Sequence, residues 1–445
     1  MYKIVIVYEH KVREMETVLL LKHELIRRGH HVEILHTQEI NIIKFLFNSP
    51  DLVITPFLYN DMNLRSINYI FGRIKKICNL QWEQVYNGSG NSEHKRTPCG
   101  NAKKAVHFCW GENSFNRLKR NGITHAILTG APQLDFLKCG FEHWYMDRET
   151  LFNEYNINSE TPTILFISSF SYLGLTDEVL KEINALTDID AFYFKKITEE
   201  SRDAILSWFE RFLSNNSKVN IIYRPHPGEP YDAKIDKLCK KYKNMYNIPD
   251  YSVKQWIKVC DLILNWYSTA GVEAFFANKS NLFLRPLRLP ENLEYEMFQN
   301  VCTAYNYSEF ETYLNNASLI DNFYVKYPLV NKIKPYYLVD KAYSFDHIVD
   351  AVEEMLTSTK YDIEIFSYKG YYRWKFHISS FINYILYILC KNKTLSKFFQ
   401  NIKKLEKRIK CINNQTYLNV DKITKNEEMQ VEEKIQKIFR QIGRI

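Results

Sequence analysis

Short apolar runs that alternate with helical stretches limit the fold of this sequence more than any other feature. Runs this uniformly apolar are typical of strands buried on both faces, so the pattern predicts a parallel sheet covered by helices on both sides. In the first third of the chain, the runs span residues 3–8, 32–35, 51–57, 77–82, 105–110 and 126–129. Helices are predicted up to residue 28, over 61–74 and over 112–121.

A second series of the same kind begins after residue 162. Its predicted strands span residues 163–168, 219–223, 261–266 and 282–285, and its predicted helices span 199–213, 232–243, 252–259, 269–277 and 345–357. Between the two series, residues 140–162 lose the periodicity and are predicted to form an interdomain linker. We therefore expect an α/β protein with two doubly wound, Rossmann-like domains, residues 1–145 and 160–357, that face a cleft. A basic helical tail, residues 361–445, follows them.

Composition excludes several classes of protein. The 445 residues are 46% hydrophobic, enough for a large core, and no run of 18 apolar residues predicts a membrane span. The start of the chain lacks the pattern of a secretory signal, and the nine cysteines occur singly, so we expect a cytoplasmic protein without structural zinc or a disulfide framework. The net charge of the chain is +8, and the excess of basic residues lies in the tail, which has 17 Lys and Arg against 8 Asp and Glu. Nucleic acid is therefore not an expected partner.

The most informative strand exit is the sequence Tyr-Arg-Pro-His-Pro-Gly-Glu at residues 223–229. Ligands of open α/β sheets bind at the carboxyl ends of strands, and the two prolines end the strand and place His226 at that edge. A histidine there can donate hydrogen bonds to a phosphate, and Arg224 adds a positive charge. The alternative is a turn in which His226 only caps a neighbouring helix.

A second exit follows the predicted strand 261–266, where the chain runs directly into a helix. Ser268 and Thr269 begin this helix and offer hydroxyls and amides to an anion, while Gly271 leaves room for a ligand. Glu273 lies one turn beyond Thr269, where a carboxylate can accept hydrogen bonds from ribose hydroxyls. The alternative is that Ser268 is only an N-cap and Glu273 a solvated residue.

Taken together and in this order, RPHPGE, STAGVEA and the following LFLRP resemble the donor half of GT-B glycosyltransferases of bacterial surface-carbohydrate and capsule synthesis. This group is related to CDP-glycerol glycerophosphotransferases and to HP-motif bacterial sialyltransferases. The resemblance implies that His226, Ser268 and Thr269 contact the donor phosphate, that Glu273 holds the ribose, and that Ser168, Ser169 and Ser171 lie near the diphosphate. It implies no bound cofactor, and a UDP-, CMP- or CDP-linked donor as substrate. Nucleotide-sugar 2-epimerases share this fold, but their paired-glycine turn is replaced here by Ser-Thr-Ala-Gly.

An inverting transfer needs a base that takes a proton from the acceptor hydroxyl. The resemblance places this base at a strand exit of the first domain, where the candidates are Glu9, His10, Asp61, Glu83 and Asp135. We rank Glu83 first and Glu9 second, because Glu83 lies between an apolar run and the polar loop 86–104. No DxD-type cluster is found at a strand exit, so we expect the donor charge to be met by histidine, arginine and helix amides rather than by a metal.

The tail carries a separate pattern. Residues 368–376 interleave aromatic and basic side chains, residues 378–390 are largely apolar, and residues 395–412 place apolar side chains at helical spacing among lysines and arginines. This composition is typical of a helix that lies on an anionic membrane surface, here the inner face of the cell membrane. The alternative is a helical hairpin packed on the protein body or on a partner in a homodimer.

The sequence thus predicts a glycosyltransferase, or polyol-phosphate transferase, that acts on a surface-polysaccharide or lipid-linked acceptor. Two other functions stay open at this stage: a nucleotide-sugar epimerase, and a non-catalytic GT-B-like scaffold in a polysaccharide assembly complex.

Overall fold

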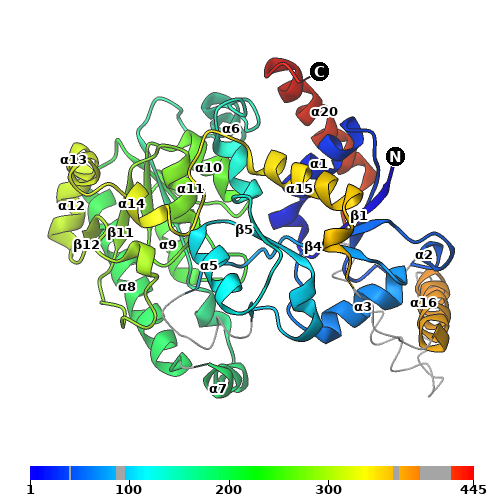
Figure 1. Ribbon diagram of the computed structural model, residues 1–445. Coiled ribbons are helices and arrows are strands. Elements are labelled where there is room, and N and C mark those ends of the chain that lie inside the picture. Colours follow the sequence, from blue (N-terminus) through cyan, green and yellow to red (C-terminus); the bar gives the residue numbers. More distant parts are fainter. Residues whose placement is uncertain (40–41, 87–95, 188, 364–369, 391–421, 445) are drawn as a thin grey trace. The chain divides into compact units, whose positions relative to one another are not determined.

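The computed structural model describes residues 1–39, 42–86, 96–187, 189–363, 370–390 and 422–444, and the chain forms two compact units. Unit 1 comprises Met1–Gln84, Arg96–Gln133 and Ala342–Ile445, and unit 2 comprises Val85–Lys95 and Leu134–Lys341. The segment predicted to be a linker contains helix α6, Arg148–Glu154, which belongs to unit 2. The two described tail helices are grouped with unit 1 (Figure 1).

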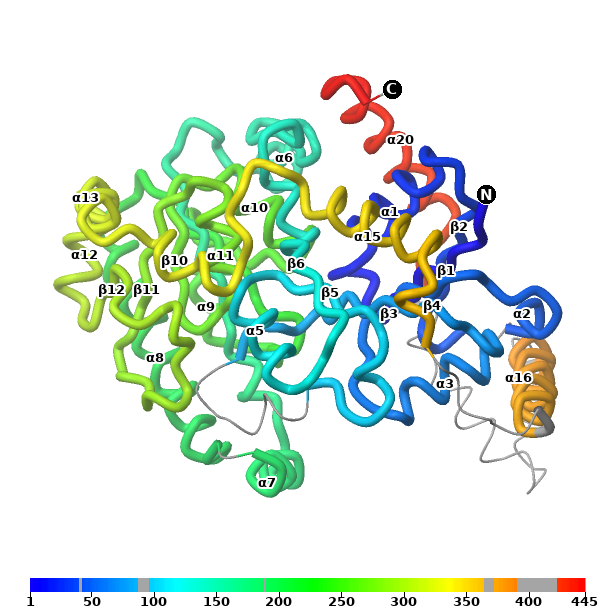
Figure 2. The backbone as a smooth tube through the Cα atoms, viewed as in Figure 1, coloured from blue at the N-terminus to red at the C-terminus, as the bar shows by residue number. Residues whose placement is uncertain are grey.

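Unit 1 is built on a six-stranded parallel sheet in the order β2-β1-β3-β4-β5-β6. Its strands are β1 Lys3–Tyr8, β2 His31–His36, β3 Leu52–Thr55, β4 Lys76–Asn79, β5 Val106–Cys109 and β6 Ala126–Leu128. Its helices are α1 Lys11–Arg27, α2 Lys44–Phe47, α3 Asp61–Phe71, α5 Glu112–Arg120, α15 Ser344–Thr357, α16 Gly370–Cys390 and α20 Lys425–Gln441. Helix α1 lies beside both α15 and α20, which come from the far end of the chain (Figure 2).

Unit 2 has a second six-stranded parallel sheet, in the order β12-β11-β10-β7-β8-β9. Its strands are β7 Thr163–Ile167, β8 Asn220–Arg224, β9 Met245–Asn247, β10 Leu262–Asn265, β11 Asn281–Leu284 and β12 Thr303–Ala304. Besides α6, its helices are α7 Asp177–Leu186, α8 Ala191–Asn215, α9 Ala233–Lys241, α10 Val253–Val259, α11 Ala270–Phe276, α12 Tyr307–Asn315, α13 Ser318–Lys326 and α14 Val330–Ile333.

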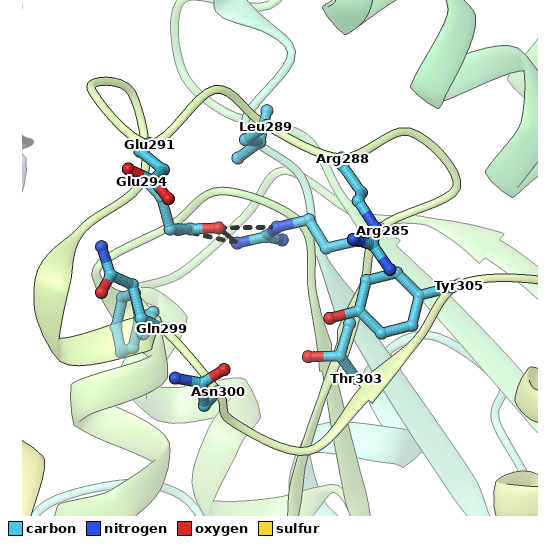
Figure 3. Close-up of a pocket in the computed structure, with 10 residues that line it drawn as sticks. Arg285, Arg288, Leu289, Glu291, Glu294, Gln299, Asn300, Thr303 and Tyr305 are labelled. Atoms are coloured by element: carbon cyan, nitrogen blue, oxygen red, sulfur yellow. Dashed lines mark hydrogen bonds and ion pairs between the residues drawn. The ribbon is translucent and has the colours of Figure 1, made fainter.

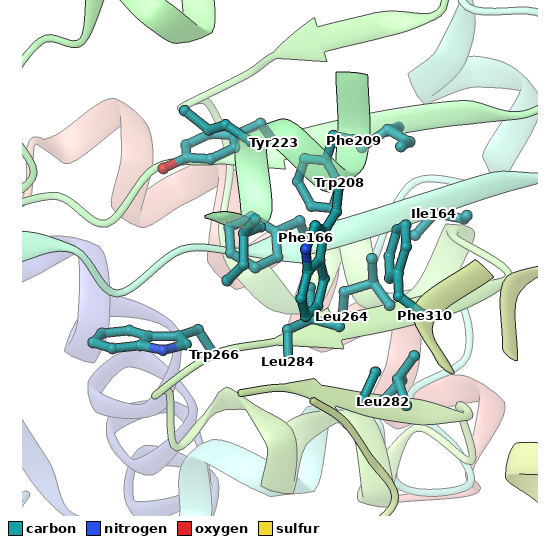
Figure 4. Packing of buried hydrophobic residues seen from close by; sticks show 14 of the residues in the cluster. Ile164, Phe166, Trp208, Phe209, Tyr223, Leu264, Trp266, Leu282, Leu284 and Phe310 are labelled. Carbon is teal, nitrogen blue, oxygen red and sulfur yellow. The ribbon is translucent and has the colours of Figure 1, made fainter. Parts of the chain in front are cut away.

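Aromatic side chains form the core of unit 2 between its sheet and helix α8 (Figure 4). Phe166 on β7 packs against Phe209 on α8 and Tyr223 on β8, with ring centroids 5.2 and 5.4 Å apart. Trp266, fully buried, follows β10 and packs on Phe170, 4.9 Å away between centroids. Because this core reaches the carboxyl ends of β7, β8 and β10, it fixes the loops that leave those strands.

Both sheets confirm the predicted fold class of doubly wound α/β domains. The predicted strands form with shifts of one to three residues at their ends. Strands β9 and β12 were not predicted, and helix α8 begins eight residues earlier than the pattern indicated, at Ala191. In the described parts of the chain, no helix is both long and apolar enough to span a membrane. The predicted amphipathic segment 395–412 lies outside the described residues.

Candidate functional site

In unit 2, the strand order reverses between β7 and β10, and loops from these two strands meet there. The chain leaves β7 toward β8 on one side and leaves β10 toward β11 on the other, and open α/β sheets bind their ligands at the carboxyl edge of such a reversal. The backbone N–H of Tyr267, after β10, donates to Oγ of Ser169, after β7, at 3.0 Å. Strand β8 is the other neighbour of β7, so its exit lies about 10 Å from that of β10. The structure therefore brings the two predicted motifs to one edge.

His226 lies in the turn after β8 with its ring orientation fixed by the backbone. The N–H of Gly228 donates to Nδ1 of the ring at 3.0 Å, and the N–H of Glu229 donates to the His226 carbonyl at 2.8 Å. A neutral imidazole that accepts at Nδ1 carries its proton on Nε2. Desolvation by the surrounding residues lowers the pKa of His226, which favours this neutral form. The turn thus presents an Nε2–H donor on an exposed residue.

Glu229 holds this turn, a role that the sequence analysis did not assign. Its carboxylate accepts hydrogen bonds from the hydroxyls of Ser168 and Tyr223, and from the backbone N–H of His226 at 3.2 Å. Burial raises the pKa of the Glu229 carboxyl, an effect that the three donors oppose. The signal was present in the sequence, since the glutamate three residues after His226 can reach back to the backbone of the same turn.

This network changes the role expected for Ser168. Its hydroxyl donates to Glu229 and lies 3.0 Å from the Tyr223 hydroxyl, whose proton is donated to Glu229, and only 2% of the residue is exposed. Ser168 therefore braces the turn instead of facing a diphosphate. Ser169 accepts from the Tyr267 N–H and is half-buried, so its own hydroxyl proton can still be donated to a ligand.

Arg224 also has a different role from the predicted one. Its guanidinium donates to the carbonyls of Ile248 and Asp250, at 3.1 and 2.7 Å, and to the carbonyl of Tyr251. Burial lowers the pKa of Arg224 to about 10. Arg224 is the last residue of β8, and successive strand residues point to opposite faces, so its side chain leaves the face of Tyr223. It secures the loop after β9 and does not present its charge at the exit of β8.

At the exit of β10, Ser268 and Thr269 differ in their hydrogen bonding. Oγ of Ser268 accepts from the N–H of Ala270 at 3.2 Å, and the Ser268 backbone is clamped on both sides by the amide of Asn265, at 2.7 and 2.9 Å. Thr269 is exposed, and its side chain makes no capping hydrogen bond. Its hydroxyl is therefore the better placed of the two to bind a ligand.

Gly271 serves packing rather than ligand access. A Cβ at this position would lie 2.9 Å from the amide nitrogens of Asn265 and Asn281 and 3.1 Å from Phe283. Helix α11 can therefore approach β10 and β11 this closely only with glycine here. The sequence analysis assigned Gly271 to ligand access; the position that its Cβ would take faces the sheet, and we assign it this packing role.

Glu273 is a half-buried carboxylate on α11. Desolvation raises the pKa of its carboxyl, and the nearby charge of Lys254 opposes this shift. The charge of Glu273 in turn helps to raise the pKa of Tyr337, which is buried. A carboxylate in this setting can accept hydrogen bonds from sugar hydroxyls, as the sequence analysis expected.

Unit 2 also contains a polar pocket of about 390 Å³ at the exits of β11 and β12 (Figure 3). Arg285, which is 5% exposed, makes a two-pronged ion pair with Glu294 at 3.0 and 3.1 Å along one wall. Arg288 lies over the ring of Tyr305, 5.4 Å from its centroid. The other lining residues are Leu289, Glu291, Phe298, Gln299, Asn300 and Thr303. The sequence analysis noted the LFLRP strand that leads here but not the pocket.

Tyr267 connects this pocket with the phosphate motif. Its hydroxyl donates to the carbonyl of Leu293 at 2.5 Å, and its ring lies 5.2 Å from that of Tyr295, between centroids. Leu293 and Tyr295 flank Glu294 in the pocket wall. Tyr267 thus contacts both Ser169, in the loop after β7, and Leu293, in the loop that carries Glu294 into the pocket wall.

In unit 1, the candidates for a base lie at the exits of β1 and β4. Glu83, ranked first from sequence, pairs with Arg96 at 2.5 Å and with Arg13 at 3.5 Å, and 39% of its side chain is exposed. Each oxygen of this carboxylate is engaged by an arginine, which leaves Glu83 less available to an acceptor hydroxyl. The residue is partly buried. The carboxylate of Glu9 lies 3.8 Å from Nε2 of His10, without an arginine within ion-pair distance in the described chain.

Three further carboxylates have structural partners. Glu14, which the sequence analysis missed, is fully buried and accepts from the backbone N–H groups of residues 9 and 10 at 2.9 and 3.3 Å, so it shapes the β1 exit. Burial raises the pKa of the Glu14 carboxyl. Asp61 accepts from the N–H of Asn101 at 2.7 Å, and Asp135 is buried against Lys138 at 3.1 Å. Within the described residues, no cluster of His, Cys, Asp or Glu could hold a metal ion.

Two doubly wound domains, each on a parallel six-stranded sheet, define the GT-B class of fold. No protein-family model matches the chain, and no curated protein matches its sequence. A solved structure described as a putative UDP-N-acetylglucosamine 2-epimerase from Listeria monocytogenes is similar, with a TM-score of 0.52 and 12% identity over 82% of this chain and 100% of that one. The S. aureus MnaA–UDP structure gives a TM-score of 0.48 and 14% identity, covering 80% of this chain and 97% of that one. The wall teichoic acid polymerase TagF gives 0.48 and 10%, covering 80% and 89%. At these identities the likeness establishes the fold alone.

Proposed function

We propose that this protein is a nucleotide-dependent transferase of cell-surface polysaccharide synthesis, which moves a sugar or polyol phosphate from a nucleotide-activated donor to a glycan or lipid-linked acceptor. The observation that carries the proposal is the Nε2–H donor of His226, fixed by Gly228 and Glu229 at the same sheet edge as Thr269. Preorganised donors at a crevice of this type favour a phosphate, because they lose little freedom when it binds.

We assign the nucleotide end of the donor to this edge. His226, Ser169 and Thr269 donate to the phosphates, and Glu273 accepts from the ribose. The arrangement requires no metal ion in the proposal, since the phosphate is met by the side-chain donors of His226, Ser169 and Thr269. The loops and the helix that carry these residues are held in place by Ser168, Arg224, Gly271 and Glu229.

The group that the nucleotide carries is assigned to the pocket beside Tyr267. Its volume lies in the range of about 300–1,000 Å³ that is usual for small-molecule sites. Arg285 is neutralised by Glu294, and Glu291 brings to the pocket wall a charge opposite to that of Arg288, so the pocket suits a hydroxylated, uncharged group better than a second phosphate. Amide, hydroxyl and carboxylate side chains can pair with the donors and acceptors of such a group.

For the base we now favour Glu9 over Glu83. In the described chain no arginine holds the Glu9 carboxylate as Arg96 holds that of Glu83, so Glu9 is the better placed of the two to take the proton of an acceptor hydroxyl.

Calorimetric titration with UDP, UDP-N-acetylglucosamine, CDP-glycerol and CMP tests the donor site. We expect one nucleotide to bind at micromolar concentration, and Gln299→Ala to weaken binding of the loaded donor about tenfold while leaving the free nucleotide unaffected. Absence of binding to any nucleotide would refute the donor site.

Turnover separates the three functions. A transferase consumes donor only when a glycan or lipid-linked acceptor is added. An epimerase, whose fold is shared, converts donor alone, and a scaffold binds the nucleotide without turnover. Mass spectrometry of the nucleotide products with and without acceptor distinguishes these outcomes.

A further inference from the structure

Helix α16 lies on the surface of unit 1 with one face fixed to the body. Nε2 of His377 donates to the carbonyls of Tyr69 and Ile70, at 2.9 and 3.1 Å, at the end of α3. The guanidinium of Arg373 donates to the carbonyl of Phe45 at 2.7 Å, and Phe376 packs against the buried cluster of this unit. These contacts fix the rotation of the helix about its own axis.

The next face of α16 around the helix axis exposes large apolar side chains. At 100° per residue, five of them fall within about 40° of one line along the helix, on the side away from Phe376. We call this set the outer stripe, and its members are Trp374, Ile378, Phe381, Ile385 and Ile388, which are 41–54% exposed. Ile382, 40% exposed, borders the stripe, and Phe47, 79% exposed, contacts Trp374 with ring centroids 6.0 Å apart.

A contiguous apolar surface of this kind marks an interaction site, because exposing it to water is unfavourable. From Trp374 to Ile388 the outer stripe is about 21 Å long. Helix α16 has 21 residues, but it is not apolar enough to cross a membrane.

The charges on α16 and at α3, the helix against which it packs, indicate which partner covers the outer stripe. Helix α16 contains no aspartate or glutamate, and Lys375 is exposed beside Trp374. Arg65 on α3 and Arg73 just after it are also exposed. Acid-free apolar helices with basic and aromatic residues at one end are typical of helices that lie in the interface of an anionic membrane. In a symmetric dimer, the same cations would face their copies, which is unfavourable.

We propose that the outer stripe of α16 binds the surface of an anionic lipid bilayer, with the helix lying in the interfacial plane. The apolar side chains enter the boundary between headgroups and acyl chains, and Lys375, Arg65 and Arg73 contact lipid phosphates. The inference is independent of the proposed function, because it rests on unit 1 and the donor site is in unit 2.

Cosedimentation of the full-length protein with vesicles tests the proposal. We expect binding to phosphatidylcholine vesicles that contain phosphatidylglycerol, weaker binding to phosphatidylcholine alone, and a partial loss as salt increases. The triple variant Ile378→Ser, Phe381→Ser and Ile385→Ser should bind at least about tenfold more weakly. The matched control variant, Val12→Ser, Val325→Ser and Met429→Ser, changes exposed apolar residues elsewhere and should bind as the wild type does.

The melting temperature of each variant shows whether it is folded, and light scattering gives its oligomeric state. A folded triple variant that binds vesicles as well as the wild type would overturn the proposal. Failure of the wild-type protein to bind anionic vesicles at low salt would also overturn it. A wild-type dimer that becomes monomeric in the triple variant, without vesicle binding by either, would instead assign the outer stripe to a second copy of the chain. Lys375→Glu should reduce binding to anionic vesicles and leave binding to phosphatidylcholine unchanged.

Discussion

Replacing His226 with phenylalanine keeps a ring of similar size but removes the Nε2–H donor that we assign to the donor phosphate. His226→Gln is the matched variant, because its side-chain amide can place an N–H near the position of Nε2. Neither change should unfold unit 2. The Gly228 N–H that loses its partner in the phenylalanine variant belongs to an exposed residue and can bond to water.

The size of the effect follows from the environment of His226. A hydrogen bond to a charged group contributes about 1.5–3 kcal/mol, and the exposure of His226 places it at the lower end because water competes. We therefore expect His226→Phe to weaken nucleotide binding roughly tenfold, and His226→Gln to retain most of the affinity. Because the surroundings lower the pKa of His226, the ring is neutral at pH 7 and binding should be flat from about pH 7 to 8.5.

Calorimetric titration with the nucleotide that binds best to the wild type measures these affinities. His143→Gln, at an exposed histidine of the same unit, is the control. Equal affinity of the phenylalanine variant and the wild type would refute the assignment of His226. An affinity that falls steeply above about pH 6.5 would show that the charged imidazolium binds the phosphate, against the tautomer inferred from Gly228.

Three other predictions follow from the same structure. In a turnover assay, Glu9→Gln should lose at least about a hundredfold in rate and Glu83→Gln less than about threefold, and the reverse order would restore the ranking made from sequence. Gly271→Ala should cost about 1–3 kcal/mol of stability through its contacts with the sheet, whereas Gly174→Ala, whose Cβ would make ordinary contacts, should melt as the wild type does. Burial lowers the pKa of His107 to about 4, so the neutral ring stabilises the fold above pH 6.5; this contribution, about 3 kcal/mol, is lost as the pH falls through about 4. Denaturant unfolding from pH 7 to 4 measures it, and a His107→Gln variant with an unchanged pH dependence would contradict it.

The sequence by itself determined the two α/β domains, because strands buried on both faces require uniformly apolar runs and the helices between them require their own periodicity. It also located the exits of β8 and β10, since proline and the Ser-Thr pair act on the neighbouring backbone. Strands β9 and β12 escaped prediction because they contain only three and two residues, too few for a periodic signal.

Tertiary structure decided what each side chain at these exits does. Arg224 donates to carbonyls more than twenty residues away, Ser168 bonds to Glu229 sixty-one residues later, and Gly271 packs against two other strands. Glu83 likewise acquired its two arginines from α1 and from residue 96, thirteen residues further along the chain. Motif and spacing fix where a residue stands along the chain. Its hydrogen-bond partners depend on which strands pair and which face each residue takes, and those are set only when the sheet assembles.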